Sequence, residues 1–166
     1  MKKIFLLLGL SMIGLLVQAQ DKPMASPRAQ ATATVKGKTI TIDYGQPSVK
    51  GREIWGKLVP YGQVWRTGAN ESTTIEFSAD AKLQGQAVPK GKYALFTIPG
   101  EKEWTIIINK GIKWGAYTYK QDEDVLRVMV PVKMVATSTE KMTFTVSKKG
   151  VVSLMWDKAQ VDFKVK

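Results

Sequence analysis

The sequence predicts an all-β fold: a single-domain antiparallel β-sandwich, or partly closed barrel, of about nine or ten short strands. Three observations support this class. After residue 27, apolar and polar residues alternate with a period of two along most of the chain, as in strands with one buried face. Turn sequences that contain glycine separate these stretches, and no stretch has a helical period. Two long loops combine glycine with aromatic residues, and they are the exceptions to the strand pattern.

The expected strands follow from this alternation. Residues 29–35 and 38–44 flank a Lys36-Gly37 turn and predict a hairpin. Residues 92–98 and 104–109 predict a second hairpin, whose β-branched and apolar second strand is expected in the centre of a sheet. The other expected strands cover residues 73–78, 82–88 with a turn near Gly85, 125–132, 142–147, 151–156 and 159–165.

The first residues have the order of a secretory signal peptide. Lys2 and Lys3 precede an apolar run that ends in a small-residue cleavage site at Ala19. That run is shorter than the roughly 20 apolar residues that a membrane-spanning helix needs, which favours cleavage over a transmembrane anchor. We therefore expect export to the periplasm or secretion. The expected organisation is a signal peptide over residues 1–19, a flexible leader over 20–26 and one folded domain over 27–166.

The composition excludes several kinds of functional site. The chain of 166 residues contains no cysteine and no histidine. Disulfides and nucleophile systems that need histidine are therefore excluded, and so are nearly all zinc, copper and non-haem iron sites. No acidic loop has the spacing of a calcium site. No metal and no cofactor are expected.

The charge of the chain is strongly positive. The formal net charge is +11 at pH 7, and it is +9 without residues 1–19, from 23 basic minus 14 acidic residues. The lysines are scattered singly, often beside glycines, and do not cluster with aromatic residues. This distribution favours a solvated surface over a nucleic-acid interface. No nucleic-acid partner is expected, and the sequence does not indicate an oligomeric state.

The long loop over residues 46–70 leads into the densest chemical cluster, residues 65–71, with the sequence WRTGANE. Arginine offers a planar fork of donors for a carboxylate or phosphate, and tryptophan offers a flat face for a sugar ring. We expect Arg66 to anchor a ligand, with Asn70 and Glu71 as directional polar partners. The alternative is structural: Arg66 pairs with an acidic side chain, Glu71 or Asp124, while Trp65 closes one end of the core.

The second loop, residues 111–123, contains Trp114, Tyr117 and Tyr119. The two tyrosines share a face if the segment is extended, and such a face can stack on glycans. The alternative is packing at the edge of the sheet. The other tryptophans, Trp55, Trp104 and Trp156, are expected in the core. The full set of candidate binding residues is Arg52, Trp65, Arg66, Asn70, Glu71, Trp114, Tyr117, Tyr119 and Asp124.

Several stretches together resemble the domain-of-unknown-function family 2911, a group of exported bacterial proteins. The strongest stretch is residues 59–71, VPYGQVWRTGANE. The resemblance runs from about Ser26 to the C-terminus, and Lys90 departs from it at a turn where similar proteins more often carry a small residue. It is further carried by Gly51-Arg52, Gly56, Gly91-Lys92-Tyr93, Thr97-Ile98-Pro99, Trp104 to Asn109, Trp114-Gly115, Tyr119, Asp124 and Arg127-Val128. The resemblance implies a β-rich fold and export, and it implies no activity.

Two classes of function remain open. The first is an exported binding or interaction module for a glycan or another cell-envelope component, with the two aromatic loops as its surface. The second is a carboxylate-dependent carbohydrate-active enzyme, for which Glu71 and the acidic run Asp122-Glu123-Asp124 supply carboxylates. The sequence favours the binding module, because the acidic run is typical of a solvated turn. It leaves the ligand unidentified.

Export predicts a defined N-terminus. Signal peptidase should remove residues 1–19 and leave Gln20 as the first residue, with or without its cyclisation. The intact mass of protein recovered from the periplasm or the medium measures this. Protein that keeps residues 1–19 in the membrane fraction would contradict it.

Overall fold

The computed structural model describes residues 25–113 and 116–166 and is built almost entirely of strands. The predicted signal peptide and most of the predicted leader lie outside the described residues. Two 3-10 turns, η1 (Ala116–Thr118) and η2 (Gln121–Glu123), are the helical segments of the described part. Neither has the length or apolar character to cross a membrane. The strands are β1 (Arg28–Val35), β2 (Lys38–Gly45), β3 (Thr74–Phe77), β4 (Ala81–Leu83), β5 (Gln86–Val88), β6 (Gly91–Ile98), β7 (Glu103–Asn109), β8 (Asp124–Val146) and β9 (Val151–Lys164).

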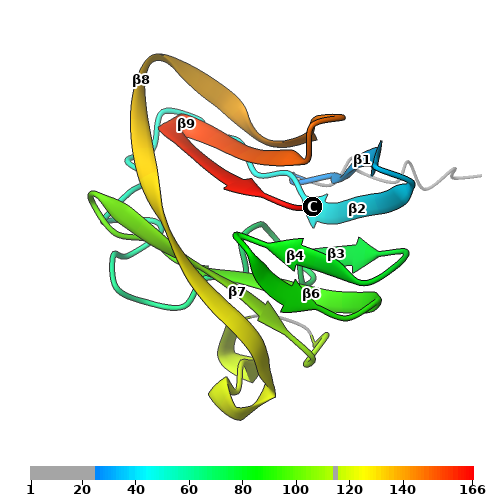
Figure 1. The fold of residues 1–166 in the computed structure, drawn as a ribbon. Helices are drawn as coiled ribbons and strands as arrows, with labels where there is room; N and C mark the ends of the chain where they lie inside the picture. Colours follow the sequence, from blue (N-terminus) through cyan, green and yellow to red (C-terminus); the bar gives the residue numbers. More distant parts are fainter. Residues whose placement is uncertain (1–24, 114–115) are drawn as a thin grey trace, which may run out of the picture.

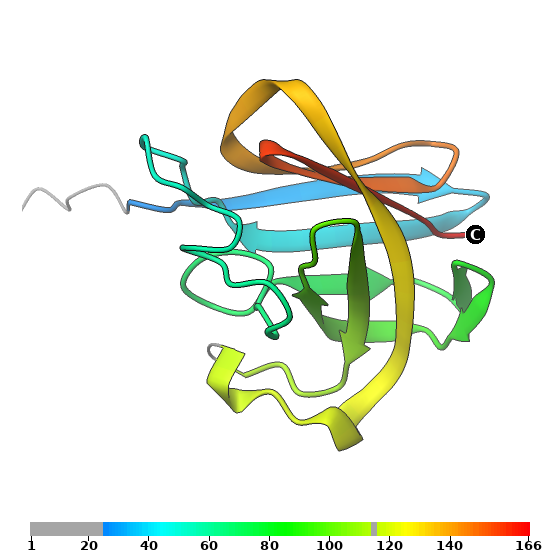
Figure 2. The same cartoon turned by 90° about the vertical axis from the view of Figure 1, so that its left-hand side faces the viewer.

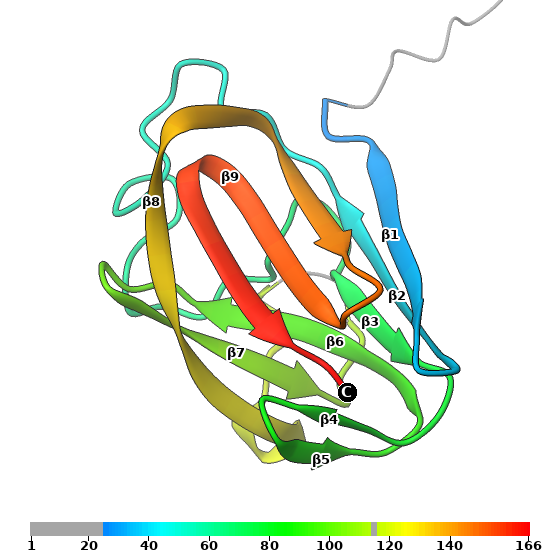
Figure 3. The ribbon, with the colours of Figure 1, turned by 45° about the horizontal axis from the view of Figure 1, so that its top comes forward.

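Seven strands form one antiparallel sheet in the order β1-β2-β3-β6-β7-β8-β9, and β4 pairs with β5 in a separate small sheet. The large sheet curls into a half-barrel, so that the β8–β9 hairpin faces β6 across the interior (Figures 1 and 3). The end of β9 continues onto the small sheet through backbone bonds between Lys82 and Lys166, with N···O distances of 2.8 and 2.9 Å. This architecture confirms the predicted all-β class.

The strand β8 is longer than the sequence predicts. Residues 125–132 and 142–147 are expected as separate strands, whereas both belong to the single strand β8. The register with β9 shifts between Met134 and Thr139 and again before Thr143. Such irregularities interrupt the alternation of apolar and polar residues, which is why the pattern is lost there. In β9 the two expected strands also join, around Asp157 with its φ of 50°.

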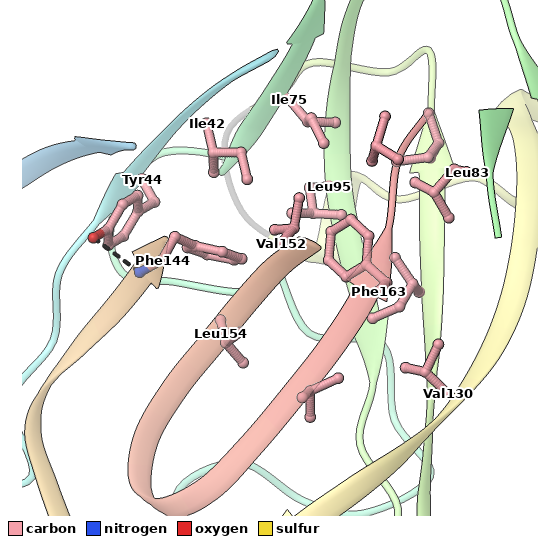
Figure 4. Close-up of a cluster of buried hydrophobic side chains, with 14 of the residues drawn as sticks. Ile42, Tyr44, Ile75, Leu83, Leu95, Val130, Phe144, Val152, Leu154 and Phe163 are labelled. Carbon is pink, nitrogen blue, oxygen red and sulfur yellow. Dashed lines mark hydrogen bonds between the residues drawn. The ribbon is translucent and has the colours of Figure 1, made fainter. Parts of the chain in front are cut away.

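The main core lies between the curled halves of the sheet. Figure 4 shows side chains of the β8–β9 hairpin, such as Val152, meeting those of β2, β3 and β6. At one edge the rings of Tyr44 and Phe144 pack edge to face with centroids 5.0 Å apart. The backbone N–H of Phe144 also donates to the Tyr44 hydroxyl at 3.1 Å. These contacts join β2 to the far end of β8.

A second, smaller cluster covers the outer face of β6 and β7. It consists of Ala94, Phe96 and Ile107, with Val64 and Tyr119 among the partly buried residues packed against it. β6 is therefore buried on both faces over most of its length. Both long loops contribute to this cover, which places them on the same side of the sheet. β7 lies between β6 and β8, and its predicted central position is confirmed.

Gly150, in the turn after β8, and Gly37, in the turn after β1, form a matched pair that tests a close backbone contact. Gly150 has a φ of 80°, and a Cβ there would lie 2.0 Å from the carbonyl oxygen of Val165, whereas Gly37 has a φ of 81° and open space around it. Gly37→Ala should cost about 1 kcal/mol for the left-handed backbone alone. Gly150→Ala should cost about 1–3 kcal/mol more, because the strand end must move. Urea unfolding measures both, and equal losses would contradict the contact.

Candidate functional site

The long loop over residues 46–72 covers one end of the half-barrel (Figure 2). Backbone hydrogen bonds attach it to β6 and to β8. Trp65 forms an isolated antiparallel bridge with Thr97 of β6, with N···O distances of 2.8 and 3.0 Å. Near its start, the backbone N–H of Val49 donates to the carbonyl of Glu140 in β8 at 2.8 Å. The loop is therefore ordered by hydrogen bonds at both ends, despite its glycine content.

Four tryptophan rings pack together under this loop, and we call them the tryptophan cluster: Trp55, Trp65, Trp104 and Trp156. Trp55 packs edge to face on Trp104 with ring centroids 4.8 Å apart, and Trp65 stacks on Trp156 at 5.8 Å with 18° between the planes. Trp104 and Trp156 are each 1% exposed, whereas the two loop tryptophans are partly exposed. The cluster therefore joins β7 and β9 to the loop and presents aromatic surface at its edge. The expectation that Trp65 closes one end of the core agrees with this packing.

A pocket of about 240 Å³ opens over the edge of the cluster, and we call it the tryptophan pocket. Its described lining combines apolar and aromatic residues with two arginines and includes no acidic side chain. Its positive potential is therefore not neutralised from within the lining. The lining residues are Ser26, Pro47, Arg52, Leu58, Val59, Trp65, Arg66, Gly68, Ala69 and Trp156.

The two arginines of the pocket have different surroundings. Arg52 donates from Nε to the carbonyl of Val49 at 3.1 Å and from Nη2 to the carbonyl of Ser48 at 2.5 Å. Arg66 makes no hydrogen bond and no ion pair with any described residue, and its Nε is buried without a partner. The structural alternative, a pair between Arg66 and an acidic side chain, is therefore not observed in the described part. Arg66 is therefore the cation of this pocket that has no partner among the described residues.

The chain turns after Trp65, and Asn70 and Glu71 therefore have different neighbours from Arg66. Thr67 and Asn70 have left-handed backbones, with φ of 55° and 63°. Asn70 donates from Nδ2 to the carbonyl of Ser26 at 3.1 Å, so it ties the N-terminal segment to the pocket rim. Gly68 is needed for close approach, because a Cβ there would lie 2.6 Å from the Thr73 hydroxyl.

Glu71 borders a second cavity, of about 500 Å³, and not the tryptophan pocket. The Ser72 hydroxyl donates to the Lys113 carbonyl at this cavity, so the two long loops touch here. Trp114 lies outside the described residues. The lining of this cavity is Arg28, Asp43, Glu71, Ser72, Thr74, Lys92, Ile112 and Lys113, and it includes an ion pair between Arg28 and Asp43.

Asp124 belongs to a third place, a hydrogen-bonded network under the second loop. Its carboxylate accepts from Arg127 Nε at 2.6 Å, from the Tyr119 hydroxyl at 2.7 Å and from Asn109 Nδ2 at 2.8 Å. The Tyr119 ring also packs edge to face on Phe96 with centroids 5.2 Å apart. Burial and the hydrogen bond to Asp124 raise the pKa of Tyr119. These contacts secure the second loop, as the edge-packing alternative predicts.

Tyr117 is 77% exposed. It sits in the 3-10 turn η1, so the extended segment on which a shared tyrosine face depends is absent. The predicted site residues are thus distributed over three places. Arg52, Trp65 and Arg66 share the tryptophan pocket, Glu71 lines the second cavity, and Tyr119 and Asp124 form the network. Among the described residues, no group of acidic side chains has the arrangement of a metal site.

Sequence reasoning missed the role of Trp156. Its place in a strand pattern correctly predicts burial, since its side chain is 1% exposed, but the same residue lines the tryptophan pocket. The alternation along one strand reports which face is buried and not which loop lies over that face. The signal that was available is the concentration of tryptophan, five residues in the chain.

A sequence model of the family described as "Protein of unknown function (DUF2911)" matches residues 26–165. The chain belongs to this family, which confirms the resemblance found in the sequence. No curated protein and no solved structure matches the chain.

Arg66 has no described partner and Arg127 pairs with Asp124, so replacing each of them should change the free energy of unfolding by a different amount. Arg66→Ala should lower the free energy of unfolding by less than about 1 kcal/mol, because it leaves no described carboxylate unpaired. Arg127→Ala should cost about 2–3 kcal/mol, because it removes a charged partner of Asp124. Urea unfolding of both variants measures this. A larger loss for Arg66→Ala than for Arg127→Ala would assign Arg66 a structural role.

Proposed function

We propose that this protein is an exported binding module, periplasmic or secreted, whose tryptophan pocket takes an acidic glycan or another anionic component of the cell envelope. The observation that carries the proposal is Arg66, a cation without a described partner on the lining of an aromatic pocket. Because no acidic side chain is on that lining, an anionic ligand meets an uncompensated positive charge there. The export part of the proposal depends on the signal pattern of residues 1–19.

The shape and composition of the pocket support a small ring as the group that enters. Ligand cavities for drug-sized molecules have volumes of roughly 300–1,000 Å³, and this pocket, at about 240 Å³, suits one ring of a longer chain. Trp65 is partly exposed and offers an aromatic face of the kind on which sugar rings stack. Leu58 lies on the lining and is 46% exposed, so apolar surface continues beyond the rim.

The enzyme alternative has less support. A carboxylate-dependent glycosidase needs two carboxyl groups on either side of one scissile bond. Glu71 lines the second cavity, whereas Asp124 is engaged by three donors in the network under the second loop. No single observation favours catalysis, and binding is the function we propose.

The proposal predicts charge-selective binding. Wild-type protein should bind oligogalacturonate, a carboxylated glycan, more tightly than a neutral cello-oligosaccharide of equal length. Arg66→Ala should weaken oligogalacturonate binding by at least about tenfold, because one charge-assisted hydrogen-bonding group is lost. Titration followed by tryptophan fluorescence measures the affinity, with Trp65 and Trp156 as reporters on the pocket lining.

The control is Lys164→Ala, which removes the same charge from a lysine that does not line the tryptophan pocket. It should leave the affinity within about twofold, apart from weak screening effects. Equal losses in both variants would indicate attraction by net charge alone and would contradict a site at Arg66. Equal affinity of the wild-type protein for the neutral and the acidic glycan would contradict the proposal as well.

A further inference from the structure

Trp156 is a core residue whose indole N–H lacks a hydrogen-bond acceptor in the described part of the chain. It lies on β9 with its side chain 1% exposed. Buried indole N–H groups usually find a hydrogen-bond partner, because an unpaired buried donor costs free energy. Trp156 is also on the lining of the tryptophan pocket. The unpaired N–H therefore belongs to a residue that a ligand in the pocket would contact.

Arg66, which also lines the tryptophan pocket, has a buried donor without a described acceptor as well. This donor is Nε, which finds no acceptor among residues 25–113 and 116–166. The two residues that carry these unpaired donors thus lie on the lining of one pocket, and that lining contains no described carboxylate. A group with two or more acceptor oxygens satisfies both donors together, and an oxyanion is such a group.

The charge of the pocket indicates that this group is an anion. The lining has two guanidinium groups and no described acidic side chain. The Arg52 guanidinium donates to two backbone carbonyls, which are neutral and leave its charge in place, and Arg66 has no described partner. An oxyanion in the pocket is therefore attracted by both charges.

We propose that Trp156 is a specificity-determining residue, and that its indole N–H and the Arg66 guanidinium together bind an oxyanion of the ligand, such as the carboxylate of a sugar acid. Trp65 lies nearly parallel to the Trp156 ring and forms the adjacent wall, against which the body of the ligand packs. This inference rests on the proposed function, because it names the group that the tryptophan pocket recognises.

The test compares Trp156→Phe with Trp104→Phe by isothermal titration calorimetry, with oligogalacturonate as the probe. Trp104 is buried to the same extent and packs in the same cluster, but it does not line the pocket. Trp156→Phe should weaken binding about tenfold, because it removes one hydrogen bond to a charged acceptor and keeps an aromatic ring. Trp104→Phe should change the affinity by less than about threefold, the spread expected for a packing change outside the lining.

Four results would overturn the inference. Wild-type affinity in Trp156→Phe, with binding lost in Arg66→Ala, would remove the role of Trp156 and leave the proposed function standing. Equal losses in the two phenylalanine variants would assign the effect to packing. Equal affinity of the wild-type protein for glucuronate and for glucose would contradict recognition of an oxyanion. Absence of oligogalacturonate binding by the wild-type protein would overturn both proposals.

A measurement on the wild-type protein covers the case in which Trp156→Phe does not fold. The indole N–H resonance of Trp156, assigned by triple-resonance NMR, should move downfield when oligogalacturonate is added, because its proton gains a charged acceptor. The Trp104 indole resonance serves as the reference and should move less. A Trp156 resonance that stays in place while the protein is saturated would overturn the inference.

Discussion

The packing of the tryptophan cluster is the interaction on which the rest of this end of the molecule depends. Trp104 and Trp156 come from β7 and β9, the two neighbours of β8, and Trp55 and Trp65 bring the long loop onto them. Large aromatic rings bury much apolar area with few rotatable bonds, so four of them can hold a glycine-rich segment at low entropic cost. The loop then needs few regular hydrogen bonds of its own. Its position in turn fixes where Arg66 lies.

Most of the fold could be predicted from the sequence, because apolar and polar residues alternate along a strand that has one buried face. Most strand positions and the central place of β7 follow from that pattern. The continuity of β8 does not follow, because the register shifts near Thr139 remove the alternation on which the prediction depends. A residue that is exposed in an irregular stretch of strand has the same sequence signature as a residue in a loop.

The candidate site was accessible only in part. Its sequence draws attention to Trp65 and Arg66, but it cannot say which neighbours face them. Two left-handed residues, Thr67 and Asn70, redirect the chain between Arg66 and Glu71, and the carboxylate that is nearest in sequence lines a different cavity. The place of Trp156 on the pocket lining depends on a contact between residues that are far apart in the chain. Neither composition nor spacing carries that information.

The closure of the half-barrel also has a consequence for the order in which the chain can fold. β2 contacts the far end of β8 through Tyr44 and Phe144, and β4 obtains its second neighbour from the last residues of the chain through Lys166. Pairings at such sequence separations are slow to form, because a long loop must close before any contact rewards it. The edge of β4 therefore stays unpaired until the distant segment around Lys166 reaches it. The tryptophan pocket has the same requirement, because Trp156 must come to lie beside Trp65 from a distant part of the chain before the lining is complete.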